Sequence, residues 1–177
     1  MAGEVGAGRR CCVGGNRQFA DLNGLSWSEA TEMFEVETDL IARIERSSDP
    51  EREYDAIEDE LYDGDNLCGL DLGIASATAA LSAARCIPFT SCNAGTFGGG
   101  HAEAYPLVGF FARLQQVELL LRAATEAGVG LENGDGGCLV VYANDVRTLR
   151  LFAVALVRER KAFDSVRVAR RTGSQSR

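Results

Sequence analysis

Residues 107–143 read LVGFFARLQQVELLLRAATEAGVGLENGDGGCLVVYA, and this stretch carries the clearest secondary-structure signals in the chain. The apolar run over 107–112 has the length of a strand. Apolar residues then recur at helical spacing over 114–124. Gly128 follows, and glycine commonly ends a helix because it adopts the left-handed conformation without strain. We therefore expect a strand followed by a helix.

The second half of this stretch predicts a hairpin, and the residues beyond it extend the pattern. A short strand over 129–132 leads through Asn-Gly-Asp-Gly-Gly at 133–137, a strong turn signal, into a β-branched strand over 138–143. Asn144 is expected to cap a further helix, because asparagine side chains accept hydrogen bonds from helix N-terminal amides. Val-Arg-Val at 166–168 alternates as an edge strand does.

These elements follow the β-α-β-β-α-β order of the ferredoxin-like fold. Two helices are then expected to cover one face of a four-stranded antiparallel sheet. The opposite face also needs cover, since Phe110, Phe111 and Tyr142 supply apolar surface to either side. We expect the helical N-terminal half to pack on that face, which makes the whole chain an α+β protein.

The N-terminal half begins with two amphipathic helices. Ser26 and Glu29 have the spacing of a capping box, and apolar residues follow them at a helical period. Asp49 and Pro50 open the second helix, because proline at the first helical position loses no hydrogen bond. The second helix has a narrow apolar stripe and an acidic remainder, which is typical of a solvated helix face.

A third helix is expected over 69–85, with Asp71 as its N-cap. It carries no charge between Asp71 and Arg85, so it should be buried. Small residues on one face, Ala75, Ala79 and Ala83, would allow a neighbouring backbone to approach closely. An edge strand containing Pro88 should follow, over 87–91.

The expected organisation is a flexible tail followed by one domain. Residues 1–24 are rich in glycine and nearly free of large apolar groups, so we interpret them as the tail. A single α+β domain then covers 25–177, with its helical part over 25–85 and its sheet part over 86–170.

Composition excludes several classes of protein. Of the 177 residues, 46% are hydrophobic and 25% are charged, which is typical of a globular chain, and no apolar run is long enough for a membrane span. The net charge is −8, and residues 1–66 alone hold 17 acidic and 6 basic side chains. Such an acidic half argues against nucleic-acid binding, which needs a basic surface.

The location expected from the sequence is cytoplasmic. The first residues lack the apolar core of a signal peptide, so the six cysteines are expected to be reduced thiols. The basic C-terminal end would fit the acidic helices of a second copy, so a homo-oligomer stays open. No particular cofactor is indicated.

A catalytic or ligand-binding site is expected in the loop over 90–103, which holds the only histidine of the chain. Cys92, His101 and Glu103 are the residue types of a thiol nucleophile, its base and the group that orients the base. The candidate ligand-binding residues are Ser91, Asn93, Gly98, Gly99 and Gly100, whose glycines would let backbone amides turn towards an oxyanion.

Metal and phosphate sites have weaker support in this loop. Cys86, Cys92 and His101 are possible ligands, but the chain has no Cys-x-x-Cys pair and no second histidine, so no metal site is predicted. The glycines also lack the lysine of a phosphate-binding loop.

Three functional hypotheses follow. The first is a small ligand- or partner-binding module with the glycine-rich Cys/His loop as its site. The second is a thiol-dependent hydrolase or transferase that uses Cys92 and His101. The third is an interaction protein whose acidic helices bind a basic partner.

Overall fold

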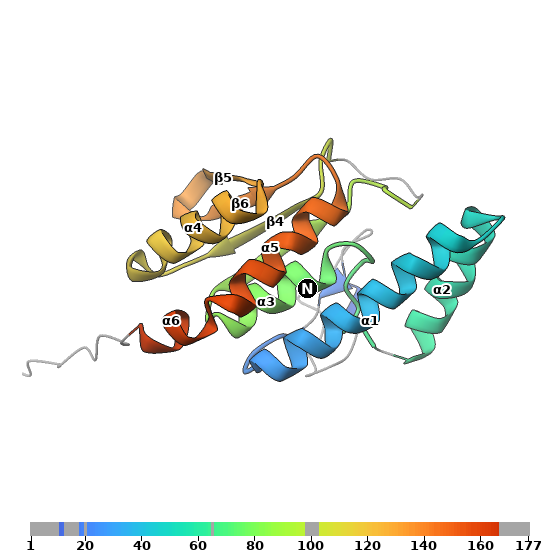
Figure 1. The fold of residues 1–177 in the computed structure, drawn as a ribbon, viewed down its shortest axis with the longest axis horizontal. Helices are drawn as coiled ribbons and strands as arrows, with labels where there is room; N and C mark the ends of the chain where they lie inside the picture. Colours follow the sequence, from blue (N-terminus) through green and yellow to red (C-terminus); the bar gives the residue numbers. More distant parts are fainter. Residues whose placement is uncertain (1–10, 13–17, 20, 65, 98–102, 167–177) are drawn as a thin grey trace, which may run out of the picture.

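The computed structural model describes residues 11–12, 18–19, 21–64, 66–97 and 103–166, and it confirms an α+β protein (Figure 1). The described helices are α1 (Trp27–Arg46), α2 (Pro50–Gly64), α3 (Ala75–Ala83), α4 (Val117–Ala127), α5 (Val146–Arg158) and α6 (Arg160–Ser165), with short 3-10 turns at Leu114–Gln116 and Asp135–Gly137. The described strands are β1 (Cys11–Cys12), β2 (Gln18–Phe19), β3 (Ile87–Cys92), β4 (Leu107–Phe111), β5 (Gly130–Asn133) and β6 (Leu139–Tyr142).

The larger sheet has the order β3-β4-β6-β5, and each neighbouring pair is antiparallel. Leu107 of β4 lies opposite both Cys92 of β3 and Tyr142 of β6. The predicted elements from β4 to α5 are all present in their predicted order.

The ferredoxin-like topology is not confirmed, because the last strand of that fold, expected after α5, is not found among the described residues. The chain continues instead into α6, and the Val166 N–H donates to the Phe163 carbonyl. Arg167 and Val168, the rest of the predicted edge strand, lie outside the described residues. The position beside β4 is taken by β3, which precedes β4 in the sequence.

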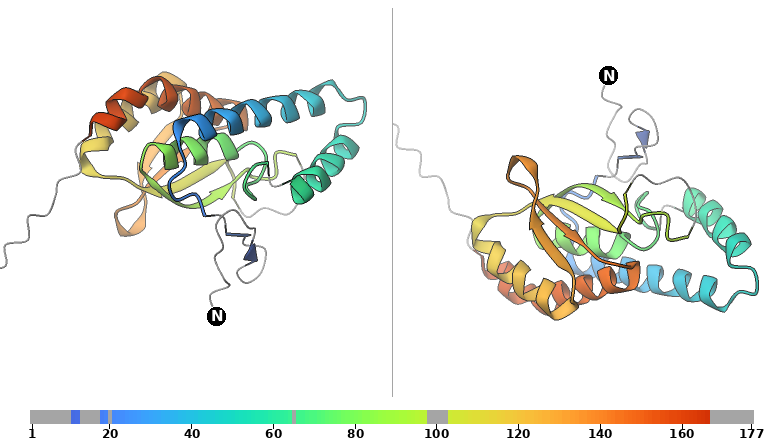
Figure 2. Two further views of the ribbon diagram at one scale, coloured as in Figure 1. Left: turned by 90° about the horizontal axis from the view of Figure 1, so that it is seen from below. Right: turned by 90° about the horizontal axis from the view of Figure 1, so that it is seen from above.

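The N-terminal helices do not cover the opposite face of the sheet, which corrects the prediction. Figure 2 shows α1, α3, α4 and α5 on one side of the sheet. Val108, Phe110 and Val141 face this side and form one core with α3, α4 and α5. Helix α1 packs on the other side of α3, because the small residues of α3 leave room for a close approach on both sides.

Helix α3 is buried as predicted, but its bounds differ from the expected 69–85. Gly69 and Gly73 have φ values of 75° and 96°, so the chain turns before Ala75 instead of continuing a helix. Asp71 is therefore not the N-cap. The residue at that position is Ile74, whose side chain makes no capping hydrogen bond.

Most of the other helix ends follow the predicted local rules. Ser26 and Glu29 form the capping box of α1, and Asp49 Oδ1 accepts from the Arg52 N–H at 3.3 Å. Gly128 ends α4 with a φ of 72°. The prediction for α5 was one residue off, because Asp145 rather than Asn144 accepts from the Thr148 N–H, at 2.7 Å.

Of the helices that the structure describes, none has both the length and the apolar character needed to cross a membrane.

Candidate functional site

The predicted nucleophile Cys92 is the last residue of β3. It is half-buried, and the Ala94 N–H donates to its Sγ at 3.4 Å. Since it lies opposite Leu107, the Cys92 side chain shares the sheet face that points away from the helices. Ser91, its predicted ligand-binding neighbour, is half-buried opposite Val108 on the helix side.

Asn93 is fully buried, and its side chain holds the loop in place. Its Nδ2 donates to the Leu72 carbonyl at 3.0 Å, and its Oδ1 accepts from the Gly95 N–H at 3.0 Å. The Asn93 carbonyl also accepts from the Thr96 hydroxyl at 2.6 Å. Asn93 therefore joins the loop after β3 to the turn before α3.

The remaining predicted site residues are not brought together in the described part of the chain. Glu103 is exposed, and His101, Gly98, Gly99 and Gly100 lie outside the described residues. Within the described segments, no three His, Cys, Asp or Glu side chains are grouped so that they could hold a metal ion. The triad of Cys92, His101 and Glu103 thus stays a prediction.

The thiols differ in their surroundings. Cys86 and Cys138 are buried, and the Cys138 Sγ donates to the Asp135 carbonyl at 3.1 Å. Burial raises the pKa of Cys86 from 9.0 to about 12, which Arg113 opposes only in part. Cys86 is therefore a poor nucleophile in the folded protein.

Alkylation of the native protein at pH 8 should modify Cys92 well before Cys86. A pKa raised from 9.0 to about 12 reduces the thiolate fraction of Cys86 about 1000-fold, and burial also blocks access. Mass spectrometry of each cysteine peptide against time checks this, with denatured protein as the control in which both label alike. Equal rates in the native protein would contradict the burial of Cys86.

The face of the sheet that points away from the helices carries an exposed apolar surface. Ile87, Phe89 and Phe111 are 66%, 50% and 43% exposed, and the Phe89 and Phe111 rings lie 5.1 Å apart. We call this surface the open sheet face and define it by these residues: Ile87, Phe89, Leu107, Phe111, Val140 and Tyr142.

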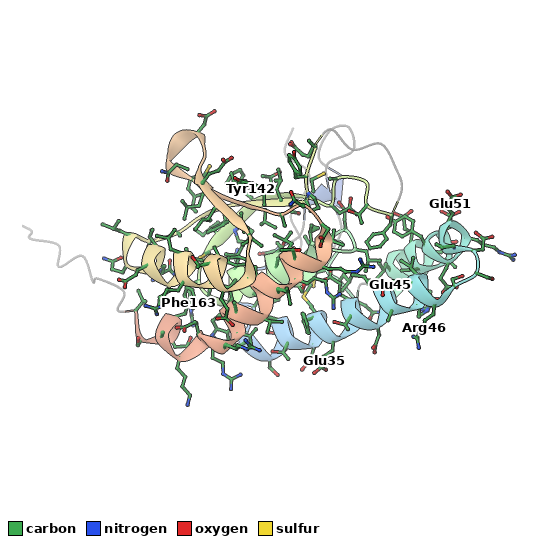
Figure 3. The ribbon with its side chains drawn as sticks, turned by 45° about the horizontal axis from the view of Figure 1, so that its top comes forward. Glu35, Glu45, Arg46, Glu51, Tyr142 and Phe163 are labelled. Carbon is green, nitrogen blue, oxygen red and sulfur yellow. The ribbon has the colours of Figure 1, made fainter. Side chains whose placement is uncertain are left out.

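Two glycines make the open sheet face flat. A Cβ atom on Gly109 would lie 3.0 Å from the Phe89 ring, and one on Gly130 would lie 2.3 Å from the Tyr142 ring. Each ring thus packs directly on glycine backbone. Figure 3 shows Tyr142 on the sheet, away from the outer side of α1 and α2, where Glu35, Glu45, Arg46 and Glu51 lie.

The rim of the open sheet face is charged, whereas its centre is not. Glu132 is exposed on β5 at one edge, Asp135 is exposed in the hairpin turn at the Ile87 end, and Glu103 is exposed in the chain that leads into β4. Arg85 and Arg113 are exposed at the Ile87 end. No ion pair joins any of these five side chains to another described residue.

A groove of about 510 Å³ lies between α1 and α5, but its cationic groups are already engaged. Arg147 pairs with Glu45 at 2.6 Å. Arg150 stacks over the Phe34 ring at 5.2 Å and lies 3.8 Å from Glu37. Both arginines that line this groove are therefore already paired with carboxylates, and its Asp145 carboxylate caps α5.

Glu37 is a buried carboxylate that the sequence reasoning missed. It is 0% exposed and accepts from the N–H groups of Gly73, Ala75 and Ser76 at 2.8, 2.9 and 3.2 Å, and from the Ser76 hydroxyl. Burial raises its pKa, while the hydrogen bonds from Ser76 and Gly73 and the charge of Arg150 oppose the rise. The missed signal was a glutamate on the apolar face of α1, between Met33 and Leu40.

No protein-family model, curated protein or solved structure matches this chain.

Proposed function

We propose that the chain is a small cytoplasmic partner-binding module whose binding surface is the open sheet face, with Cys92 at one end of it. The observation that carries this proposal is the joint exposure of Ile87, Phe89 and Phe111. Large apolar side chains bury about 150–250 Å² each, so three that are roughly half exposed present on the order of 300 Å². A contiguous apolar patch of this size on a protein surface is often a binding site.

The loop after Cys92, which the sequence predicted to be the functional site, now lies at one end of the proposed binding surface. Because Cys92 and Leu107 lie opposite each other at the end of the face, a partner on the sheet would also contact the loop that follows Cys92. Thiol chemistry by Cys92, His101 and Glu103 is the alternative function, but no contact among the described residues favours it.

We also propose that the sheet is a rearranged ferredoxin-like sheet in which β3 occupies the place of the fourth strand. The order β4-β6-β5 and the antiparallel pairing on both sides of β4 support this. In such a sheet one face is covered by helices and the other is available to a partner.

Replacing Phe111 by threonine should remove partner binding without unfolding the protein. Threonine suits a strand, and Phe111 is 43% exposed, so the cost in stability should be small. Tagged wild-type protein should retain a partner from an extract of cells that make it naturally, and Phe111→Thr should lose that partner at least tenfold.

The matched control is Leu121→Gln, which changes a side chain on α4 that is 50% exposed and lies off the open sheet face. The partner identified with the wild type should bind this variant as well as it binds the wild type when both proteins are purified. A partner held equally by Phe111→Thr would overturn the proposed function.

A further inference from the structure

The dimensions of the open sheet face limit what can cover it. Four strands spaced by about 4.8 Å span roughly 14 Å, and five residues of strand span about 17 Å. A stable interface between two globular chains buries about 800 Å² on each partner. The three half-exposed apolar side chains of the open sheet face present only on the order of 300 Å², so a second copy would also have to bury surface outside this face.

A single α-helix fits the same surface. Three helical turns are about 16 Å long and a helix is about 10 Å wide, which matches the length of the strands and most of the width of the sheet. The exposed apolar residues, including the tilted ring pair of Phe89 and Phe111, lie along β3 and β4 in the direction of such a helix. On the other face of the sheet, side chains of helices α3, α4 and α5 pack against the strands.

The charges around the face indicate the polar residues of that helix. Glu132 lies on the β5 edge and Glu103 precedes β4 towards the Cys92 end, whereas Asp135, Arg85 and Arg113 lie at the Ile87 end. None of the five has an ion-pair partner among the described residues. Lysine or arginine beside the apolar stripe of a partner would complement these carboxylates.

We infer that the open sheet face binds an amphipathic helix about three turns long, with an aliphatic or aromatic stripe and basic residues beside it. This inference rests on the proposed function and specifies the chemistry of the partner. Apolar contacts to Phe89, Phe111 and Tyr142 supply the affinity. Glu132 and Glu103 favour basic residues on the side of the partner helix that lies over them, away from Arg85 and Arg113.

Three labelled synthetic peptides test the inference by fluorescence anisotropy with the full chain. The first has a leucine stripe with lysines beside it, the second replaces those lysines by glutamates, and the third scrambles the first so that the stripe is lost. The first peptide should bind, and the other two should bind at least tenfold more weakly. Phe111→Thr and Ile87→Thr should each weaken the first peptide at least tenfold, while Leu121→Gln should not.

Charge reversal at the rim tests the second half of the inference. Glu132→Lys should weaken the lysine peptide and strengthen the glutamate peptide, whereas the same reversal at Glu35, an exposed residue of α1, should change neither. Equal binding of the scrambled peptide, or binding that Phe111→Thr leaves unchanged, would overturn the inference.

The inference and the proposed function can fail separately. If no peptide binds and the chain instead forms a dimer that Phe111→Thr abolishes, the helix inference is wrong while the face remains a binding surface. If the partner found in extract binds Phe111→Thr as well as wild type, the proposed function itself is wrong.

Discussion

Replacing Glu37 by alanine is expected to lower the free energy of unfolding by about 3–5 kcal/mol, because it removes one member of a buried charged network. Three backbone N–H groups before and within α3 would lose their acceptor, and Arg150 would keep its charge without the carboxylate 3.8 Å away. Urea unfolding followed by circular dichroism measures the change.

The control for this substitution is Glu35→Ala, two residues away on the exposed side of α1 (Figure 3). Its effect should stay within about 0.5 kcal/mol, because it touches none of the groups that Glu37 joins. Similar losses in both variants would show that removal of any glutamate from α1, rather than loss of the network, determines the result.

The contribution of Glu37 to the free energy of unfolding should change with pH in one defined direction. Burial raises the pKa of Glu37 in the folded state above its ordinary value of 4.5, so the folded protein takes up this proton at a higher pH than the unfolded chain does. As pH falls from neutral towards 4.5, the wild type should therefore gain stability relative to Glu37→Gln. A difference between the two proteins that stays constant over this range would contradict the raised pKa.

Local sequence signals predicted the helix ends whose capping residues are close to them in the chain. The capping box of Ser26 and Glu29, the Asp49–Pro50 start and the glycine that ends α4 each involve residues within a turn or two. The N-terminus of α3 differs, because its acceptor is Glu37, 36 to 39 residues earlier. No local rule identifies a cap that comes from another helix.

The arrangement of the sheet was only partly accessible for a similar reason. Alternation and turn residues predicted β3, β4, β5 and β6. Local patterns do not indicate which strands pair with each other, so the pairing of β3 with β4 could not be predicted from them. The apolar residues of β4 could serve either face, so the sequence alone did not indicate that Phe110 is buried while Phe111 is exposed.

The candidate site shows the same limit. Cys92 was expected in the loop just after an edge strand over 87–91, and it is the last residue of that strand. The exposed side chains Ile87 and Phe89 were interpreted only as strand residues. Their exposure depends on where α1 packs. Because α1 packs on α3 instead of on the sheet, these side chains become surface, and no composition or spacing rule contains that information.

Replacing Gly73 by alanine is expected to destabilise the protein by about 2–5 kcal/mol, which combines left-handed backbone strain of about 1–2 with overpacking of about 1–3 kcal/mol. Gly73 has a φ of 96°, and a Cβ there would lie 2.7 Å from Val146 Cγ1 and 3.3 Å from the Phe97 ring. Moving the backbone to relieve the clash would also displace the Gly73 N–H from Glu37, 2.8 Å away.

Gly128→Ala separates the two contributions. Gly128 has a φ of 72° but nothing within 4 Å of an added Cβ, so this variant should show the backbone strain alone, about 1–2 kcal/mol. In a double-mutant cycle, Val146→Ala should reduce the cost of Gly73→Ala, because it removes the closest atom that the new Cβ meets. Equal losses for Gly73→Ala and Gly128→Ala would mean that the turn before α3 is not packed tightly against α5. Gly73 and Glu37 together determine where α3 begins. That result would therefore also argue against the buried network around Glu37 as the feature that holds α3 between α1 and the sheet.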